Sequence, residues 1–228
     1  MSIWAAVPVR SLWGSKRRLA PLLTPAERAA LSACLLAGVL RALRAVPFIA
    51  RVVVVSPDPA ARALAATHGV DTLADPPTVR DAADAALNAA LDTVGRQATA
   101  AGAPALLVLP ADLPLVQPSD VAAVLAALPA APTLVLVPTA DGGTGALLRA
   151  PPTAVPACFG PDSAYRHLAA AREHGVRARL LWRPRLALDC DEPRDLLPLV
   201  EAPVSAELRA LLAAWRVPAR VSPAGGSR

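Results

Sequence analysis

Short, continuously apolar runs alternate along the chain with longer alanine-rich stretches of helical character. Three of the apolar runs are typical of strands buried on both faces: 3–9, 51–56 and 105–109. Thr24, Pro25 and Glu27 supply an N-cap, a proline at the first helical position and an acid in the first turn, so a helix is expected from there to about Arg44, before Pro47. The order strand, helix, strand predicts an α/β protein.

The same alternation continues through most of the remaining chain. Further helices are expected at 58–68, 79–101, 119–128, 162–174 and from about residue 193, and further strands at 70–73, 133–137, 146–149, 178–182 and 186–189. Such alternation requires right-handed crossovers and helices on both faces of a sheet, which predicts a three-layer α/β/α fold with a mostly parallel sheet. Strand 146–149 and the proline-rich segment after it are expected to form a loop-rich insertion that walls a substrate site.

Composition limits the class of protein. With 228 residues and 54% hydrophobic content, the chain is expected to form one domain over 1–218 and a disordered tail over 219–228. The apolar runs are too short to cross a bilayer, which takes roughly 20 helical residues, and the first residues lack a secretory leader, so a cytoplasmic location is expected. Cys34, Cys158 and Cys190 form no CxxC pair and are interpreted as buried small residues, outside any disulfide framework or thiolate metal site.

Charge indicates the kind of ligand. The net charge is +5, but the arginines are spread along the chain and aromatic residues make up only 3%, which argues against nucleic acid and favours a small anionic substrate. Lys16 is the only lysine among 23 basic residues. A lysine is a compact point charge on a flexible stem, and a phosphate held in a tight loop can require it where arginine does not serve.

The loop after the first expected strand contains that lysine. Backbone N–H groups, the small residues Ser11 and Gly14, and the charges of Arg10 and Lys16 predict a phosphate cradle. The loop has neither the form of a P-loop nor the Rossmann G-x-G-x-x-G pattern, and a solvated basic turn is the alternative. We expect Arg10 and Lys16 to act on the triphosphate of a nucleotide, with Pro8 and Ser11 among the nucleotide contacts.

Acidic residues follow three other expected strands. Asp112 stands between Pro110 and Pro114, where a carboxylate is expected to bind magnesium or a nucleotide; a turn or N-cap aspartate is the alternative. Asp189 and Asp191 are two residues apart on a strand end, so their like charges repel unless a divalent cation lies between them. Alternatively, Asp191 caps the next helix and Asp189 faces solvent.

Several polar residues in expected helices have less specific interpretations. Asn88 is a poor helix former, so it is either a base or ribose contact of the nucleotide or a plain surface residue. Asp120 is expected to be an ordinary first-turn acid. The histidines have no ligand spacing and are interpreted as structural: His68, His167 and His174.

Five short motifs occur in order: P-V-R-S-L-x-x-S-K-x-R-L, P-A-D-L-P, D-G-G-T, F-G-P-D-S and L-A-L-D-C-D-E-P-x-D-L. On these motifs the chain, from about residue 3 to 200, closely resembles the guanylyltransferases of coenzyme F420 biosynthesis, which couple GTP to 2-phospho-L-lactate or to phosphoenolpyruvate. The resemblance implies a Rossmann-like nucleotidyltransferase fold, a GTP site built from the opening loop, and dependence on Mg²⁺. The arginine- and alanine-rich composition suggests the actinobacterial branch, which is associated with phosphoenolpyruvate.

The resemblance also implies residue roles. The residues that match the acidic metal positions are Asp112, Asp189 and Asp191, and those that would bind the phosphorylated three-carbon acid are Thr144, Gly160 and Ser163. Two positions depart from the pattern, because the family often has lysine where Arg10 stands and asparagine where Gly145 stands. Arg10 keeps the charge, whereas Gly145 removes a polar side chain and puts the details of acceptor recognition in doubt.

The expected reaction suits these residues. An acceptor phosphate has a second pKa of roughly 6, so its oxygen is a ready nucleophile at pH 7 and needs no general base. We expect GMP transfer from GTP to phosphoenolpyruvate, with 2-phospho-L-lactate or 3-phosphoglycerate as alternative acceptors and handover of the labile product to the next transferase. Two competing hypotheses are a sugar-1-phosphate or molybdopterin-type nucleotidyltransferase, although the G-x-G-x-R opening is missing, and an inactive nucleotide-binding scaffold.

Overall fold

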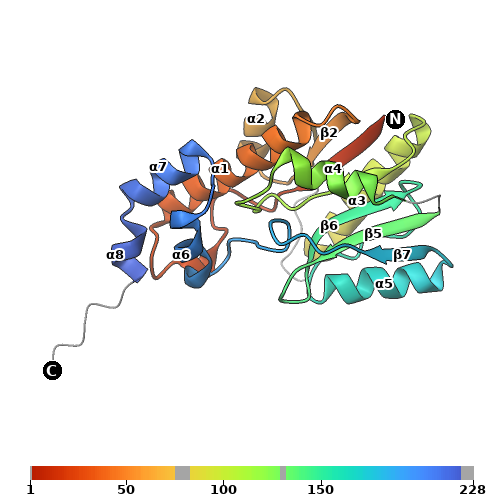
Figure 1. Ribbon diagram of the computed structural model, residues 1–228. Coiled ribbons are helices and arrows are strands. Elements are labelled where there is room, and N and C mark those ends of the chain that lie inside the picture. Colours follow the sequence, from red (N-terminus) through yellow and green to blue (C-terminus); the bar gives the residue numbers. More distant parts are fainter. Residues whose placement is uncertain (1, 75–82, 129–131, 222–228) are drawn as a thin grey trace.

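The computed structural model describes residues 2–74, 83–128 and 132–221 (Figure 1). The strands are β1 (Ile3–Pro8), β2 (Ile49–Val55), β3 (Asp71–Leu73), β4 (Leu106–Val108), β5 (Thr133–Pro138), β6 (Thr144–Ala150) and β7 (Arg177–Leu180). The helices are α1 (Pro25–Arg44), α2 (Pro59–Thr67), α3 (Ala83–Ala100), α4 (Pro118–Ala126), α5 (Ser163–Glu173), α6 (Pro193–Glu201), α7 (Ala206–Ala214) and α8 (Val217–Val221), with a 3₁₀ turn at Arg17–Leu19. Part of the expected helix 79–101 lies outside the described residues.

All seven strands belong to one sheet, in the order β3-β2-β1-β4-β6-β5-β7. The pairs β1–β2, β1–β4, β2–β3 and β5–β7 are parallel, so the expectation of a mostly parallel sheet is confirmed. β6 runs antiparallel to both of its neighbours, β4 and β5, and all seven of its residues are buried. The segment expected to carry a short strand in a loop-rich insertion is therefore an interior strand of the sheet.

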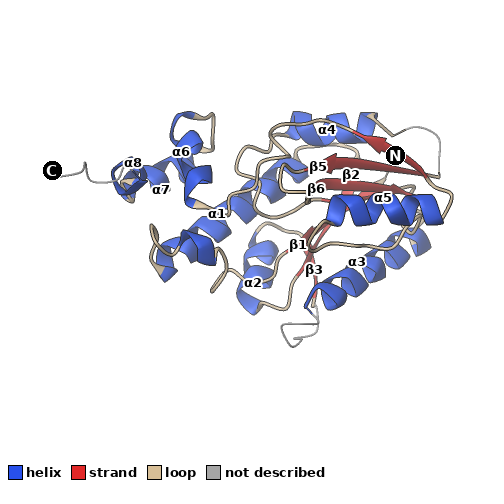
Figure 2. Cartoon of the chain, turned by 90° about the horizontal axis from the view of Figure 1, so that it is seen from below, coloured by secondary structure: helices blue, strands red, loops and turns tan. Residues whose placement is uncertain are grey.

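Helices cover both faces of the sheet (Figure 2). One apolar cluster joins the sheet to α1, α2 and α4, through residues such as Leu40, Ala61 and Val121. A second joins the opposite face to α3 and α5, through residues such as Leu91 and Ala170. These two clusters confirm the three-layer α/β/α arrangement.

The C-terminal helices form a third apolar cluster with the first half of α1. Leu31 and Leu35 of α1 pack there with Leu199, Leu212 and other residues of α6, α7 and α8. Figure 1 shows these helices beside α1, away from the sheet. The single final helix expected from residue 193 is wrong, because α6 ends at Glu201, Ser205 caps α7, and Arg216 with φ 52° separates α7 from α8.

Two other sequence expectations need correction. Residues 219–221 belong to α8 rather than to a disordered tail, and 222–228 lie outside the described residues. The expected strand 186–189 is a turn, because the N–H groups of Leu186 and Ala187 both donate to the Arg183 carbonyl at 2.9 Å and so do not pair with a strand. The alternating pattern that suggested a strand arises because Leu186 and Leu188 pack into different apolar clusters from a loop.

Local sequence explains how α1 begins. The Thr24 hydroxyl accepts a hydrogen bond from the Glu27 N–H at 3.3 Å, and the Glu27 carboxylate accepts one from the Thr24 N–H at 2.7 Å. This reciprocal capping box satisfies two backbone donors that the first helical turn leaves free.

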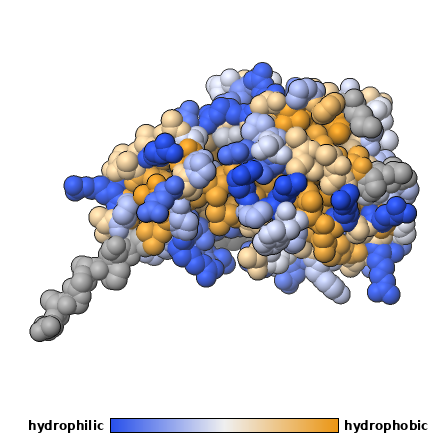
Figure 3. Space-filling view, viewed as in Figure 1, coloured by the Kyte–Doolittle hydropathy of each residue, from blue (hydrophilic) through white to orange (hydrophobic). Residues whose placement is uncertain are grey.

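On the face of the molecule that Figure 3 shows, hydrophilic residues interrupt the apolar patches. No helix within the described residues has the length and apolar character to cross a bilayer.

Candidate active site

A cavity of about 750 Å³ opens where β1 and β4 end. Its wall includes the opening loop from Pro8 to Arg17, the segment from Pro110 to Asp112, and Gly160 with Asp191. Ligands of open α/β sheets bind at the carboxyl ends of the strands, which is where this cavity lies. The predicted residues that line it are Pro8, Arg10, Ser11, Lys16, Asp112, Gly160 and Asp191.

Lys16 is buried at the base of the opening loop. Its ammonium group donates to the Cys190 carbonyl at 2.7 Å and to Asp191 Oδ1 at 3.0 Å, and lies 3.4 Å from Asp112 Oδ2. Its side chain is only 5% exposed, so Lys16 is not a solvated turn residue, whereas Arg10 of the same loop is 61% exposed. Burial opposes the charge, but the carboxylates of Asp112 and Asp191 outweigh it, so the pKa of Lys16 is raised and the ammonium form persists.

Of the three aspartates expected to act together, Asp112 and Asp191 line the cavity and face Lys16, whereas Asp189 does not line it. Asp189 is partly buried, and burial together with the charges of Asp112 and Asp191 raises its pKa to about 6. The alternative that Asp191 caps the following helix is wrong: Glu192 is the N-cap of α6, and Asp195 accepts the N–H groups of Asp191 and Glu192 at 3.0 and 2.7 Å. Asp191 is therefore free to face Lys16.

The donor set suits a hard divalent cation. Carboxylate oxygens are the ligands Mg²⁺ prefers, and Asp189 has no hydrogen bond or ion pair among the described residues to offset its repulsion from its neighbours. In the described part of the chain, however, no three His, Cys, Asp or Glu side chains converge closely enough to enclose a metal ion. The ammonium of Lys16 takes the place between Asp112 and Asp191, and metal binding by these aspartates stays a prediction.

The opening loop is tied to two carboxylates that the sequence interpretation did not include. Asp58, the N-cap of α2, accepts the Leu12 N–H at 2.7 Å and the Ser11 hydroxyl at 3.2 Å. Arg10 forms an ion pair with Asp84, in the first turn of α3. Asp58 follows β2 and has prolines nearby, as Asp112 does after β4. Its place after a strand was therefore a signal in the sequence. Nothing in the sequence pattern indicated Asp84.

Two of the predicted acceptor residues, Thr144 and Ser163, form a separate group. The hydroxyls of Thr144 and Ser163 are 2.9 Å apart and buried, and Thr144 Oγ1 lies 3.2 Å from His167 Nδ1. His167 Nε2 accepts the Cys158 N–H at 2.9 Å, so Nδ1 is the nitrogen that carries the proton. His167 is structural, as expected, but it also orients the two hydroxyls. Neither Thr144 nor Ser163 lines the cavity.

Gly160 lies on the cavity wall with φ 121°, a conformation that side chains rarely adopt. A Cβ there would come within 2.5 Å of the Asp84 carboxylate and 2.8 Å of the Arg166 guanidinium. Asn88 anchors Phe159, the residue that precedes Gly160. The Asn88 side-chain amide donates to the Phe159 carbonyl at 3.0 Å and accepts the Phe159 N–H at 2.8 Å. Asn88 is thus not a plain surface residue; it anchors this loop, and its direct contact with a nucleotide stays a prediction.

Three further expectations concern isolated side chains. Asp120 is a first-turn acid of α4, as expected, and it also receives both prongs of the Arg185 guanidinium at 2.8 and 2.9 Å. All three cysteines are free; Cys190 is buried as expected, whereas Cys34 and Cys158 are only partly buried. His68 and His174 end α2 and α5 as their C-caps.

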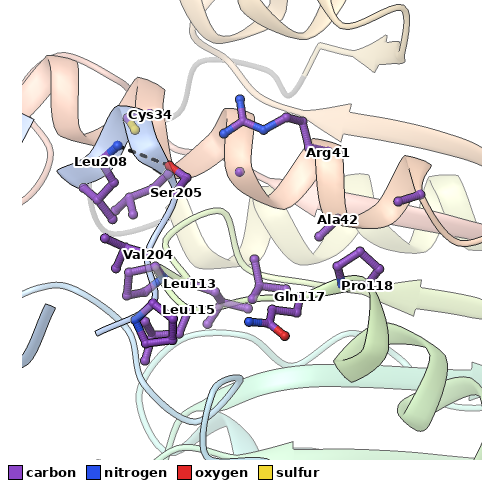
Figure 4. Close-up of a pocket in the computed structure, with 16 residues that line it drawn as sticks. Cys34, Arg41, Ala42, Leu113, Leu115, Gln117, Pro118, Val204, Ser205 and Leu208 are labelled. Carbon is purple, nitrogen blue, oxygen red and sulfur yellow. Dashed lines mark hydrogen bonds between the residues drawn. The ribbon is translucent and has the colours of Figure 1, made fainter. Parts of the chain in front are cut away.

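A second cavity, of about 390 Å³, lies between α1, the loop that follows Asp112 and the α6–α7 connection (Figure 4). Its wall is mostly apolar and includes Leu113, Leu115 and Val204. The charged group at this cavity, Arg41, pairs with Glu207 at 3.3 Å. The cavity at the strand ends, where charged groups are gathered, is the candidate active site.

The sheet, with a basic loop and aspartates at its strand ends, defines an α/β protein with a ligand site at the carboxyl ends of its strands. Solved structures agree on the fold: a Desulfovibrio desulfuricans protein described as a nucleotide-diphospho-sugar transferase matches with a TM-score of 0.75 at 18% identity, covering 97% of each chain. CMP:2-keto-3-deoxy-manno-octonic acid synthetase matches with a TM-score of 0.55 at 15% identity, covering 94% of this chain and 99% of that one.

Sequence comparison identifies the family. Residues 3–213 match the family model described as "Guanylyl transferase CofC like". Phosphoenolpyruvate guanylyltransferase of Rubrobacter xylanophilus is 46% identical over 200 residues, which cover 87% of this chain and 94% of the relative. The 3-phospho-D-glycerate guanylyltransferase of Phenylobacterium zucineum is 36% identical over 204 residues, covering 87% and 90%. The chain belongs to the CofC-like guanylyl transferase family and is a guanylyltransferase, as the motifs predicted.

Proposed function

We propose that this enzyme transfers GMP from GTP to phosphoenolpyruvate and releases pyrophosphate, within coenzyme F420 biosynthesis. The observation that carries the proposal is the cavity in which a basic loop faces Asp112 and Asp191 at the strand ends. Relatives named phosphoenolpyruvate guanylyltransferase, at 46% and 41% identity, support the choice of acceptor. The product would be enolpyruvyl-2-diphospho-5'-guanosine.

The chemistry is a single displacement at phosphorus. A phosphate oxygen of the acceptor forms a bond to the α-phosphorus of GTP, and the bond from that phosphorus to the bridging oxygen breaks, so the electron pair leaves with pyrophosphate. The acceptor phosphate is already largely ionised at pH 7, so no side chain has to remove a proton. The work of the protein is to align the two phosphates and to offset their repulsion.

The chain's own residues divide this work. Arg10 would leave Asp84 to meet the triphosphate, while Lys16 would bring positive charge to the same phosphates from its buried position. Mg²⁺, when bound by Asp112, Asp189 and Asp191, would supply a Lewis acid for the α-phosphate and the leaving pyrophosphate. Gly160 on the cavity wall would contact the acceptor, and Thr144 and Ser163, whose buried hydroxyls do not line the cavity, would become accessible when the acceptor binds, with His167 fixing the direction of the two hydroxyls.

The test is pyrophosphate release by the purified enzyme with GTP, Mg²⁺ and each acceptor in turn. We expect turnover with phosphoenolpyruvate, and much less when ATP or CTP replaces GTP. A higher kcat/KM with 3-phospho-D-glycerate would reassign the acceptor, an outcome that the Phenylobacterium relative makes worth testing. No pyrophosphate with phosphoenolpyruvate, 2-phospho-L-lactate or 3-phospho-D-glycerate would contradict the proposal. Handover of the product to a following transferase stays a prediction.

A further inference from the structure

Gly145 occupies an irregular position at the end of β6. Val137 of β5 pairs with Ala146, and Pro138 pairs with Thr144, so Gly145 is an extra residue with no partner on β5. This is a β-bulge, a device that bends a strand and redirects the side chains beside it, and it is frequent next to active sites. The residue redirected here is Thr144, one of the predicted acceptor contacts.

The backbone of a distant turn lies directly on Gly145. A Cβ at this position would lie 2.8 Å from the carbonyl carbon of Leu186 and closer still to its oxygen. The obstacle is backbone, which cannot rotate away as a side chain can, so the turn would have to retreat by well over an ångström to admit a methyl group. In this chain, which has glycine where the family often has asparagine, the missing side chain is therefore what allows the Leu186 backbone to approach β6 this closely.

The turn, 183–187, is held from two other sides as well. Leu186 is fully buried in the apolar cluster shared by the sheet, α1, α2 and α4. Arg185 forms its two-pronged ion pair with Asp120, whose side chain is 4% exposed. A planar guanidinium that meets a carboxylate with two bonds fixes direction as well as distance. The turn is thus clamped between β6 and α4.

Asp189 follows this turn after only one intervening residue, Leu188. A chain advances by at most about 3.6 Å per residue, so a segment this short transmits a displacement of the turn to Asp189 with little slack. Resting on the function proposed above, we propose that Gly145 and the Arg185–Asp120 pair are positioning residues that place Asp189 and Asp191 against Asp112. They touch no substrate; they set where the acidic cluster forms.

The test compares Gly145→Ala with Gly38→Ala, a matched control in the interior of α1, where a Cβ would meet nothing within 4 Å. Three quantities are measured: Mn²⁺ binding in the presence of GTP, kcat, and the KM for GTP. Mn²⁺ binding is monitored through the loss of the EPR signal of the free ion. We expect Gly145→Ala to weaken Mn²⁺ binding at least about tenfold and to lower kcat by about 10- to 100-fold, since a misplacement of about 1 Å can cost that much. Gly38→Ala should leave all three values unchanged.

Arg185→Ala is the second variant, because it loosens the turn from the other side without a clash and keeps the test informative if Gly145→Ala folds poorly. It should weaken Mn²⁺ binding and lower kcat by about 3- to 10-fold, with the KM for GTP nearly unchanged, as expected when about one charged hydrogen bond is lost. Wild-type Mn²⁺ affinity and kcat in both variants would overturn the proposal, and so would a wild-type enzyme that binds no Mn²⁺. A wild type that binds Mn²⁺ but releases no pyrophosphate would instead contradict the proposed function alone.

Discussion

Two buried polar groups of this enzyme differ in how their charges are balanced. Around Lys16, one ammonium group faces Asp112 and Asp191, and burial together with these two charges raises the pKa of Asp189 to about 6, so negative charge exceeds positive charge. Around His167, a neutral ring accepts one backbone N–H and faces one hydroxyl, and its hydrogen-bonding groups are satisfied. An unbalanced cluster is suited to bind a further charged species, whereas a balanced one fixes geometry.

The largest effect should come from removing the cation of the unbalanced group. Lys16→Ala leaves Asp112 and Asp191 facing each other and takes a positive charge from the phosphates, so kcat should fall by about 100- to 1,000-fold. Lys16→Arg should not restore it, because a rigid planar fork differs in shape from the ammonium that meets three oxygens here.

Kinetics with several acceptors would check this prediction. The loss should be the same for every acceptor, since the residue is expected to act on GTP, and Arg209→Ala on the exposed surface of α7 serves as the control. A loss confined to one acceptor would show that Lys16 belongs to acceptor recognition instead.

The balanced group should show itself in the pH dependence of stability. Burial, with the charge of Arg149 adding to it, lowers the pKa of His167 to about 4 from its ordinary 6.5. Below pH 6.5 the unfolded chain binds a proton that the folded protein does not, so the free energy of unfolding should decrease as the pH falls from 6.5 to 4, by up to about 3 kcal/mol. Above pH 6.5 neither the folded nor the unfolded chain binds this proton, so His167 adds no pH dependence to the free energy of unfolding.

Urea unfolding at pH 7.5, 6 and 5 would measure the pH effect. His167→Gln lacks the titrating ring, so it should be less stable than wild type at pH 7.5 but lose less of its free energy of unfolding between pH 7.5 and 5. Parallel pH curves for the two proteins would show that another group causes the decrease.

The smallest effect expected is a change in KM that would distinguish a role of the buried hydroxyls in acceptor binding from a purely structural role. Ser163→Ala removes one hydroxyl of the pair that His167 orients, and the loss of one hydrogen bond should raise the KM for the acceptor about tenfold while the KM for GTP stays constant. Ser205→Ala, which removes the N-cap of α7, is the matched control: it should lower stability and leave both KM values unchanged. If Ser163→Ala behaves like this control, the buried hydroxyls serve only the framework.

Much of the fold could be predicted because its signals are local. The valine run of β2, the capping box of α1 and the proline at the first position of α2 each fix an element by backbone preference and burial alone. The turn at 183–187 could not be predicted in this way, because Leu186 and Leu188 alternate as in a strand while their burial depends on packing against distant clusters. The direction of β6 was likewise hidden, since an apolar run has the same pattern in either direction.

The sequence by itself determined that this protein is a guanylyltransferase-like α/β enzyme with a basic opening loop and aspartates near strand ends, since those residues are identifiable from order and type. Only the tertiary structure decided their partners. It turned Lys16 toward Asp112 and Asp191, paired Arg10 with Asp84, and brought the backbone of Leu186 onto Gly145. These contacts join residues far apart in the chain, and charge balance and close packing are properties of the assembled site that no local pattern contains.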